Sequence, residues 1–352
     1  MFVVRWAHPQ HTKIPIGEIN GDDVTRQQQI SVIVAVATFR RPDCLQRVLP
    51  QLVEQVASAG VNASVLVVDN DPDGGAAQYV RRFASPIVRY VHEPHPGISA
   101  ARNRALDESS SADAVVFIDD DEEPGPHWLT TLVERWADWR CAAVTGPVVA
   151  TFDGGPPDPW VVASGVFDRR RRVTGESLRG AASNNLLLDV AQLSGLGLRF
   201  EDSYGLTGGS DTRLTHELVA RGGVIRWVEE AEVVDHIPVG RATRSWVLKR
   251  SFRTSNDWSR VALDLAPGRR SRLRERADLT ARGIVRASRG ARHWLIGVFL
   301  RDTDRRARGV VEVVEAAGMT LGAYGYVASE YRRAAAQSRS TTTAGSGAAG
   351  VR

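Results

Sequence analysis

Apolar runs and helical stripes alternate along the first third of the chain. Residues 30–38 (ISVIVAVAT) form a run that no charge interrupts, which predicts a strand buried on both faces. From Leu45 to Val56 apolar residues recur at helical spacing, so we expect a helix with one stripe against a sheet and a kink at Pro50. Further strands are expected at residues 64–70 and 86–91.

This alternation continues with a helix expected over residues 96–106 and a buried strand over 114–118. Strands that alternate with helices predict an α/β fold, with a mostly parallel sheet flanked by helices. We assign this domain to residues 30–265, after a polar N-terminal extension, residues 1–29. A helical C-terminal region is expected over 266–335, and the low-complexity tail, residues 336–352, is expected to be disordered.

The strand at 114–118 runs into the acidic segment FIDDDEEP. Its five consecutive carboxylates are unfavourable together unless a cation or a set of hydrogen-bond donors compensates them. A solvated acidic turn is one interpretation. However, the loops that leave the carboxyl ends of parallel strands are where open α/β sheets bind ligands, so a ligand site is the interpretation we prefer.

Polar side chains follow three of the expected strands. Thr38, Arg40 and Arg41 follow the first, Asp69 and Asp71 the second, and Asp119 to Asp121 the fourth. Because parallel strands point the same way, these residues should converge at one sheet edge. Carboxylates spaced D-x-D suit a hard divalent cation, and neither GxGxxG nor GxxxxGK[ST] follows the first strand. We therefore expect a nucleotide diphosphate held through Mg²⁺ or Mn²⁺.

Composition narrows the class of protein. The 352 residues are 43% hydrophobic and 24% charged, which excludes disorder of the whole chain. Two distant cysteines, no secretory signal and no apolar run of about 20 residues favour a cytoplasmic protein without a spanning helix. The net charge of +4 comes with no nucleic-acid-binding signature, so we expect no nucleic acid partner.

Seven ordered motifs between residues 30 and 260 resemble those of glycosyltransferase family 2, whose fold is GT-A: VAVATFRRPDCLQRVL, VLVVDNDPDG, EPHPGISAARNRAL, VVFIDDDEEPGPHWL, NNLLLDV, GLTGGSDTRLTHELVARGG and EVVDHIPVGRATRSWVLKR. The resemblance implies an inverting, metal-dependent transferase. Its donor would be a nucleotide-diphospho-sugar and its acceptor a saccharide or lipid-linked hydroxyl, in cell-surface polysaccharide or glycolipid assembly.

The resemblance also implies roles on the donor side. Four positions match residues at the nucleotide: Thr38, Arg40, Asp69 and Arg102. Asp119 and Asp121 match the ends of the family's DxD motif, the first associated with ribose or metal and the second with the metal, while Asp120 is the middle residue. His236 matches a histidine near the metal or diphosphate; a purely structural histidine is the alternative.

On the acceptor side, the resemblance implies that Asp211 is the general base. Ser210 stands where family members often carry Glu, and the alternative interpretation of this pair is a helix N-cap. A segment that closes over the donor is matched by Arg241, Arg244, Trp246, Lys249 and Arg250. Its basic residues would neutralise the departing diphosphate, and Trp246 would line the acceptor site or simply pack.

Two other functions stay open: a sugar-nucleotide nucleotidyltransferase, and a non-catalytic family member that acts as a partner in a polysaccharide-assembly complex. The apolar segment at residues 294–300, with arginines around it, and a second stretch from Val310 predict peripheral contact with the inner face of the cell membrane. Packing of both stretches on the catalytic domain is the alternative.

Overall fold

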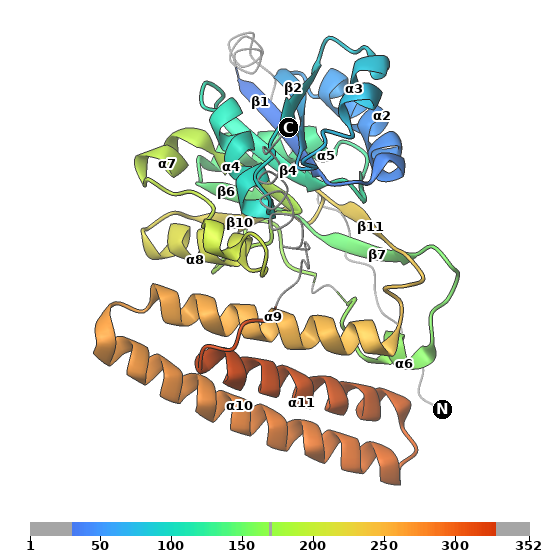
Figure 1. Ribbon diagram of the computed structural model, residues 1–352, viewed down its shortest axis with the longest axis vertical. Coiled ribbons are helices and arrows are strands. Elements are labelled where there is room, and N and C mark those ends of the chain that lie inside the picture. Colours follow the sequence, from blue (N-terminus) through green and yellow to red (C-terminus); the bar gives the residue numbers. More distant parts are fainter. Residues whose placement is uncertain (1–29, 169–170, 329–352) are drawn as a thin grey trace, which may run out of the picture.

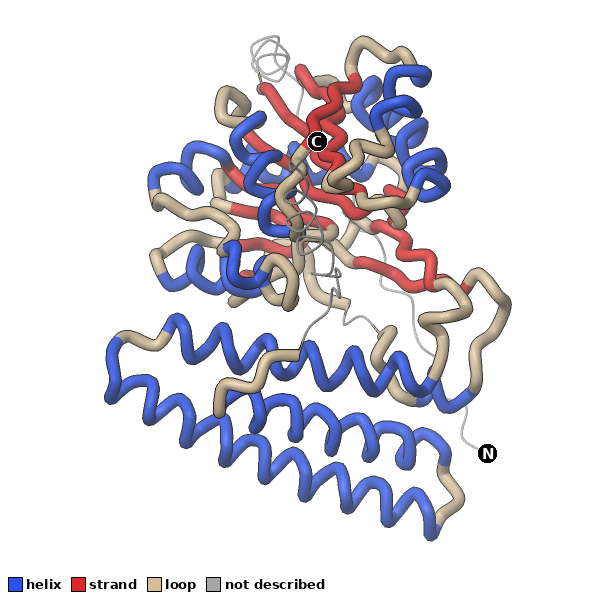
Figure 2. The backbone as a smooth tube through the Cα atoms, in the orientation of Figure 1, coloured by secondary structure: helices blue, strands red, loops and turns tan. Residues whose placement is uncertain are grey.

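The computed structural model describes residues 30–168 and 171–328 (Figure 1). The expected N-terminal extension and the expected disordered tail lie outside the described residues. A strand-and-helix domain occupies one end of the molecule, and three long helices lie side by side at the other (Figures 1 and 2).

Eight strands form the larger sheet, and its first half is parallel. β1 lies between β2 and β4 and runs parallel to both, and β2 runs parallel to β3. β9 is antiparallel to its neighbours β4 and β6, so the second half is mixed. This confirms the mostly parallel α/β sheet. In spatial order the strands are β3 (Val88–His92), β2 (Asn62–Asp69), β1 (Ser31–Thr38), β4 (Ala114–Asp119), β9 (Asn185–Asp189), β6 (Ala143–Thr145), β10 (Ile225–Trp227) and β8 (Ser177–Leu178).

Helices cover both faces of this sheet. Along β1, Val32, Val34 and Val36 pack on one face, with α2 and α5, while Ile33 and Ala35 pack on the other, with α4, α7 and α8. Burial on both faces is why the strand reads as one uninterrupted apolar run. These helices are α2 (Pro42–Ser58), α4 (Ile98–Glu108), α5 (Trp128–Trp139), α7 (Val190–Gly195) and α8 (Ser210–Ala220); α3 (Ala77–Phe83) follows β2.

Strand register brings three chain segments to one edge of the sheet. Thr38 at the end of β1 pairs with Asp69 at the end of β2, and Ala37 pairs with Asp119 at the end of β4. The prediction that these strand ends converge is therefore confirmed.

A smaller sheet begins inside the acidic segment. β5 (Glu122–Pro124) pairs antiparallel with β11 (Val233–Ile237), which runs parallel to β7 (Val148–Phe152). Asp235 lies opposite Glu122 in this pairing. Two further short helices are α6 (Pro159–Ala163) and the 3₁₀ turn η1 (Asp202–Tyr204).

The C-terminal helices α9 (Arg244–Leu265), α10 (Gly268–Phe299) and α11 (Thr303–Ala323) pack on one another, and α9 also contacts α8 and α6. Glycines set the spacing of α10 and α11: a Cβ added to Gly290 would lie 2.7 Å from the carbonyl oxygen of Gly309. Among residues 30–168 and 171–328, no helix is long and apolar enough to cross a membrane.

Most expected elements are present with shifted ends. The helix expected from Leu45 begins at Pro42, because proline is favoured in a first helical turn where its missing N–H costs nothing. β2 begins earlier than expected, at Asn62, and β3 ends later, at His92. The helical region expected from residue 266 is preceded by α9, which joins the two parts of the molecule.

The glycine contact between α10 and α11 generates a stability prediction. Gly290→Val should lower the free energy of unfolding by about 1 to 3 kcal/mol, because the new side chain would push the two backbones apart. Ala291→Val, an exposed neighbour on the same helix, is the matched control and should cost a few tenths of that. Urea denaturation followed by circular dichroism measures both, and equal stability of the two variants would contradict the close packing.

Candidate active site

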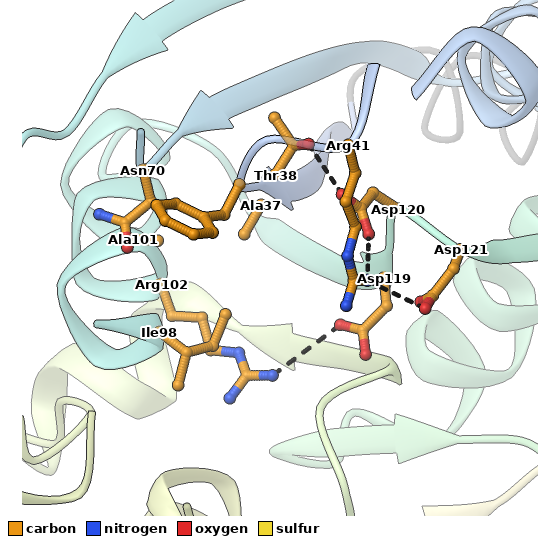
Figure 3. Close-up of a pocket in the computed structure, with 11 residues that line it drawn as sticks. Ala37, Thr38, Arg41, Asn70, Ile98, Ala101, Arg102, Asp119, Asp120 and Asp121 are labelled. Carbon is orange, nitrogen blue, oxygen red and sulfur yellow. Dashed lines mark hydrogen bonds and ion pairs between the residues drawn. The ribbon is translucent and has the colours of Figure 1, made fainter. Parts of the chain in front are cut away.

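Two adjoining cavities lie where β1, β2 and β4 end. The inner pocket has a volume of about 180 Å³, and the outer cleft, about 520 Å³, extends from it toward α8, β11 and α9. The inner pocket is lined by Ala37, Thr38, Phe39, Arg41, Asn70, Ile98, Ala101, Arg102, Asp119, Asp120 and Asp121 (Figure 3). The outer cleft shares Arg41, Ile98, Arg102, Asp119 and Asp121 with it.

Asp120 ties the end of β4 to the end of β1. Its buried carboxylate accepts a hydrogen bond from Thr38 Oγ1 at 2.7 Å and another from Arg41 Nη1 at 3.1 Å. Burial raises the pKa of Asp120, and the Arg41 charge and the Thr38 hydroxyl oppose that shift. The middle residue of the D-x-D spacing therefore holds the two strand ends together at the pocket wall.

Asp121 faces two arginines. Its Oδ2 lies 2.9 Å from Arg41 Nη1 and 3.1 Å from Arg241 Nη1. Arg41 lies just after β1 and Arg241 in the segment after β11, so two segments distant in sequence bring positive charge to Asp121. A cation that binds this carboxylate would have to displace one of the two arginines.

Asp119 opens into both cavities. Its side chain is 44% exposed at the cavity surface, and Arg102 Nη2 lies 3.9 Å away. The loss of surrounding solvent raises the pKa of Asp119, Arg102 lowers it, and Asp121 and Asp120 raise it further. Negative charge here is therefore undercompensated, which favours a cation.

The last two acidic residues of the segment differ in position: Glu122 also lines the outer cleft, whereas Glu123 does not. Glu122 is buried, and it accepts hydrogen bonds from Asn184 Nδ2 at 2.5 Å and from the Asp119 backbone N–H at 3.2 Å. Burial, then the charges of Asp119 and Asp235, raise the pKa of Glu122. Glu123 instead pairs with His236. The five carboxylates thus have separate environments.

Arg102 connects the acidic strand end to helix α8. This buried residue on α4 donates from Nη1 to Ser210 Oγ at 3.2 Å, and its guanidinium lies over the Phe200 ring. Figure 3 shows its other end directed at Asp119. Ser210, where a glutamate was expected from the family pattern, is therefore part of this bridge.

Asp211 faces the outer cleft from the first turn of α8. Its Oδ1 accepts from the Thr212 N–H at 2.7 Å, and its Oδ2 lies 3.4 Å from the Ser183 N–H. The N-cap is Gly209, with φ of 87°, and no side chain caps the helix. The N-cap interpretation of Ser210 and Asp211 is thus wrong.

Arg40 and Asp69 lie beside the pocket but do not line it. Arg40 has φ of 53° and directs its side chain outward to Asp71 and Asp73. The next residue, Arg41, enters the pocket in its place. Asp69 is buried and accepts hydrogen bonds from the N–H groups of Asp71 and Ala76 and from the Tyr90 hydroxyl. It therefore organises the loop that carries the pocket residue Asn70.

His236 and Arg244 also point away from both cavities. Side chains alternate along a strand, so Asp235 of β11 lines the cleft while His236 faces Glu123 and Asp153, each at 3.2 Å. Arg244 pairs with Asp158 at 2.8 Å. The structure brings neither residue to the D-x-D carboxylates.

The cleft wall formed by α9 holds two predicted residues, Trp246 and Arg250, and two that sequence reasoning missed, Arg253 and Asp257. Trp246 lines the cleft and stacks on Phe167 with ring centroids 5.6 Å apart. Arg250, Arg253 and Asp257 follow on the same helix. Their helical spacing after Trp246 was the available signal, but nothing in the sequence indicated that this helix lies across the sheet edge.

The part of the chain that the structure describes contains no group of three or more His, Cys, Asp or Glu side chains that could hold a metal ion. Asp119 and Asp121 nevertheless present hard oxygen ligands to the cavity. A divalent cation that keeps only one or two carboxylates and completes its coordination with phosphate and water fits this arrangement.

Comparisons with known proteins agree on one family. The family model "Glycosyl transferase family 2" matches residues 33–193. The chain is similar to "Succinoglycan biosynthesis protein ExoM" of Rhizobium meliloti (strain 1021), with 36% identity over 249 residues that cover 69% of this chain and 79% of that one.

Solved structures share the fold at low identity. "GalNAc-T7 with UDP, GalNAc and Mn2+" aligns with a TM-score of 0.50 and 12% identity over 67% of this chain, and the match spans about half of that chain's own length, 48%. S. aureus TarS 1–349 aligns with a TM-score of 0.48 and 13% identity, covering 79% of this chain and 89% of that one. The first likeness supports the GT-A fold.

The hydrogen bonds of Asp69 generate a prediction that separates loop support from ligand contact. Asp69→Asn should lower the free energy of unfolding by about 1 to 3 kcal/mol, because an amide nitrogen cannot accept and one buried N–H loses its partner. Asp73→Asn, at the exposed end of the Arg40 ion pair, is the control and should cost less than about 1 kcal/mol. Unchanged stability of Asp69→Asn in urea denaturation would contradict the loop-support role.

Proposed function

The chain belongs to glycosyl transferase family 2, as its motifs predicted, and on that premise we propose that it is an inverting enzyme that takes a sugar from a nucleotide-diphospho-sugar. The family makes the protein a glycosyltransferase with the GT-A fold. The observation that supports the inverting mechanism is that two cavities meet at Asp119. Arg41 and Arg102 bring positive charge to the inner pocket, and Asp211 lines the outer cleft.

The donor is assigned to the inner pocket and the shared wall. Arg41 and Arg102 supply positive charge to a diphosphate, and Asn70 and Thr38 lie on the walls that enclose a nucleotide. Arg241, from the segment after β11, lies within reach of the same position because it already contacts Asp121. On this proposal Arg40 and Asp69 act on the donor indirectly, through the loops that they order.

Asp121 and Asp119 are the proposed holders of Mn²⁺ or Mg²⁺. The raised pKa of Asp119 supports the proposal, since it marks negative charge with little compensation. Asp121 faces the same cavity and could exchange its contact with Arg241 for a contact with the metal. When bound, the metal would supply positive charge to the departing diphosphate. The GalNAc-T7 structure that shares the fold contains Mn²⁺ together with UDP. We leave His236 out of the ligand set because its ring faces Glu123 and Asp153.

Asp211 is the proposed general base. The acceptor hydroxyl enters through the outer cleft, its proton passes to a carboxylate oxygen of Asp211, and its oxygen forms a bond to the anomeric carbon as the bond from that carbon to the diphosphate breaks. Attack from the side opposite the leaving group inverts the anomeric centre. Arg102 and Ser210 position the start of α8 relative to Asp119 for this step.

The similarity to ExoM supports a role in polysaccharide assembly, with a saccharide or a lipid-linked sugar as acceptor. Membership in a glycosyltransferase family removes the reason to prefer a nucleotidyltransferase. A non-catalytic partner role would give no chemical reason for the Asp211 carboxylate in the cleft. Loss of sugar transfer on substitution of Asp121 or Asp211 distinguishes catalysis from that role.

Asp121→Asn should abolish most sugar transfer and weaken Mn²⁺-dependent binding of the donor, because the amide binds a hard cation poorly. The variant should still fold, although the loss of the ion pairs with Arg41 and Arg241 should lower the free energy of unfolding by about 1 to 3 kcal/mol. Calorimetric titration of donor with and without Mn²⁺ measures the effect. Glu123→Gln, the acidic neighbour that faces His236, is the matched control and should keep donor binding. Equal transfer in EDTA and in Mn²⁺ would refute metal dependence.

Asp211→Asn should lower turnover by about 10²- to 10⁴-fold, because the variant keeps the shape of the side chain but loses the proton acceptor. Donor affinity should barely change, which distinguishes this variant from Asp121→Asn. Asp43→Asn is the control, since Asp43 also lies in the first turn of a helix but outside both cavities. Near-normal turnover of Asp211→Asn with a correct donor and acceptor would remove Asp211 from the mechanism.

A further inference from the structure

Helix α10 carries an unusual concentration of positive charge. Between Gly268 and Phe299 it contains nine arginines and two acidic residues, a net charge of +7, whereas the whole chain has a net charge of +4. The helix has 32 residues and is therefore about 48 Å long. It lies at the end of the molecule opposite the sheet, with α11 and α9 on one side of it (Figure 2).

The two sides of α10 differ in chemistry. Leu279, Gly283, Gly290 and Gly297 are its buried residues, and they recur every four or seven positions on the side that meets α11. The opposite side is apolar as well, but it is exposed: Ile284 is 62% exposed, Leu295 60% and Phe299 88%. These three residues are 11 and 4 positions apart, so they lie within one narrow stripe.

Arginines border this exposed apolar stripe. With 100° of rotation per residue, Arg270, Arg274 and Arg292 lie within a quarter turn of the line through Ile284, and all three are exposed. Leu273 and Val298 extend the stripe along the helix, and Val285 lies beyond the arginines, about 100° from Ile284. An exposed apolar stripe with arginines along one side of it is typical of helices that lie in a membrane interface.

A groove beside the stripe also combines apolar side chains with arginines. It lies between α9, α10 and α11, with a volume of about 600 Å³, and Trp258, Val285 and Met319 supply its apolar wall. Arg282, Arg286 and Arg289 stand along it. Thr254 belongs both to this groove and to the outer cleft of the active site, so the basic, apolar surface continues to the place where the acceptor is proposed to enter.

We propose that the exposed side of α10 docks on the surface of an anionic lipid bilayer. The apolar stripe enters the boundary between headgroups and acyl chains, and the bordering arginines contact lipid phosphates. This docking is independent of the donor, the metal and the catalytic residues.

Charge complementarity selects the bilayer over a second copy of the chain. Two α10 helices packed stripe to stripe would bring two net charges of +7 together, and like charges at such a distance repel. An anionic surface attracts the same charges, and each basic residue near it contributes on the order of fivefold in affinity.

Co-sedimentation of the full chain with vesicles tests the proposal. The chain should sediment with phosphatidylcholine vesicles that contain phosphatidylglycerol, should not sediment with pure phosphatidylcholine, and should be released by salt. Leu295→Glu/Phe299→Glu should lower vesicle affinity at least tenfold. Arg270→Gln/Arg274→Gln/Arg292→Gln should lower it about a hundredfold, from about fivefold for each arginine. All five substituted residues are exposed, and thermal unfolding checks that the variants fold.

Val173→Glu, an exposed apolar residue of a loop outside α9 to α11, is the matched control and should bind vesicles as the parent does. Equal sedimentation with neutral and anionic vesicles would overturn the proposal, as would unchanged affinity of Leu295→Glu/Phe299→Glu. So would a dimer, seen by analytical ultracentrifugation without vesicles, that this double variant dissociates, because the stripe would then serve self-association.

Discussion

Five carboxylates follow one another where β4 leaves the core, and each needs its own compensation because like charges at this spacing raise one another's pKa. The fold supplies it from different directions. Asp120 turns to Thr38 and Arg41, Glu122 to Asn184, and Glu123 to His236. Asp119 and Asp121 are the two that line both cavities. The partners of these carboxylates belong to different strands and loops, so the acidic segment can be compensated only when all of those elements have folded around it.

The same division explains how a donor site and an acceptor site come to share a wall. Arg102 is buried between Asp119 and Ser210, so the guanidinium that neutralises the strand end also holds the first turn of α8. Asp211 follows directly in that turn. Ser210, which replaces the glutamate of the family pattern, accepts a hydrogen bond from Arg102. The carboxylate of Asp211, proposed for proton transfer, still lines the cleft.

Strand ends were predictable from the sequence because parallel register places them together: Thr38 and Asp69 are paired residues. Side-chain direction in the loops was not predictable. Arg40 takes a positive φ and turns outward while Arg41 turns inward, and no local pattern distinguishes two adjacent arginines. His236 points away from both cavities because β11 belongs to the smaller sheet, where side chains alternate between the two faces and Asp235 takes the side of the cleft. The α9 residues in the cleft depend on the packing of α9 across the sheet edge, a tertiary contact that local periodicity does not contain.

We propose that Asp119 and Asp121, at the end of β4, bind a divalent cation together with the donor diphosphate. A crystal structure of the chain with Mn²⁺ and a nucleoside diphosphate, in which anomalous diffraction locates manganese, tests it most directly. We expect a manganese peak at the Asp121 carboxylate, with the diphosphate against it and with Arg241 moved from Asp121 to the phosphates. A nucleotide bound in the inner pocket with no manganese at Asp119 or Asp121 would contradict it.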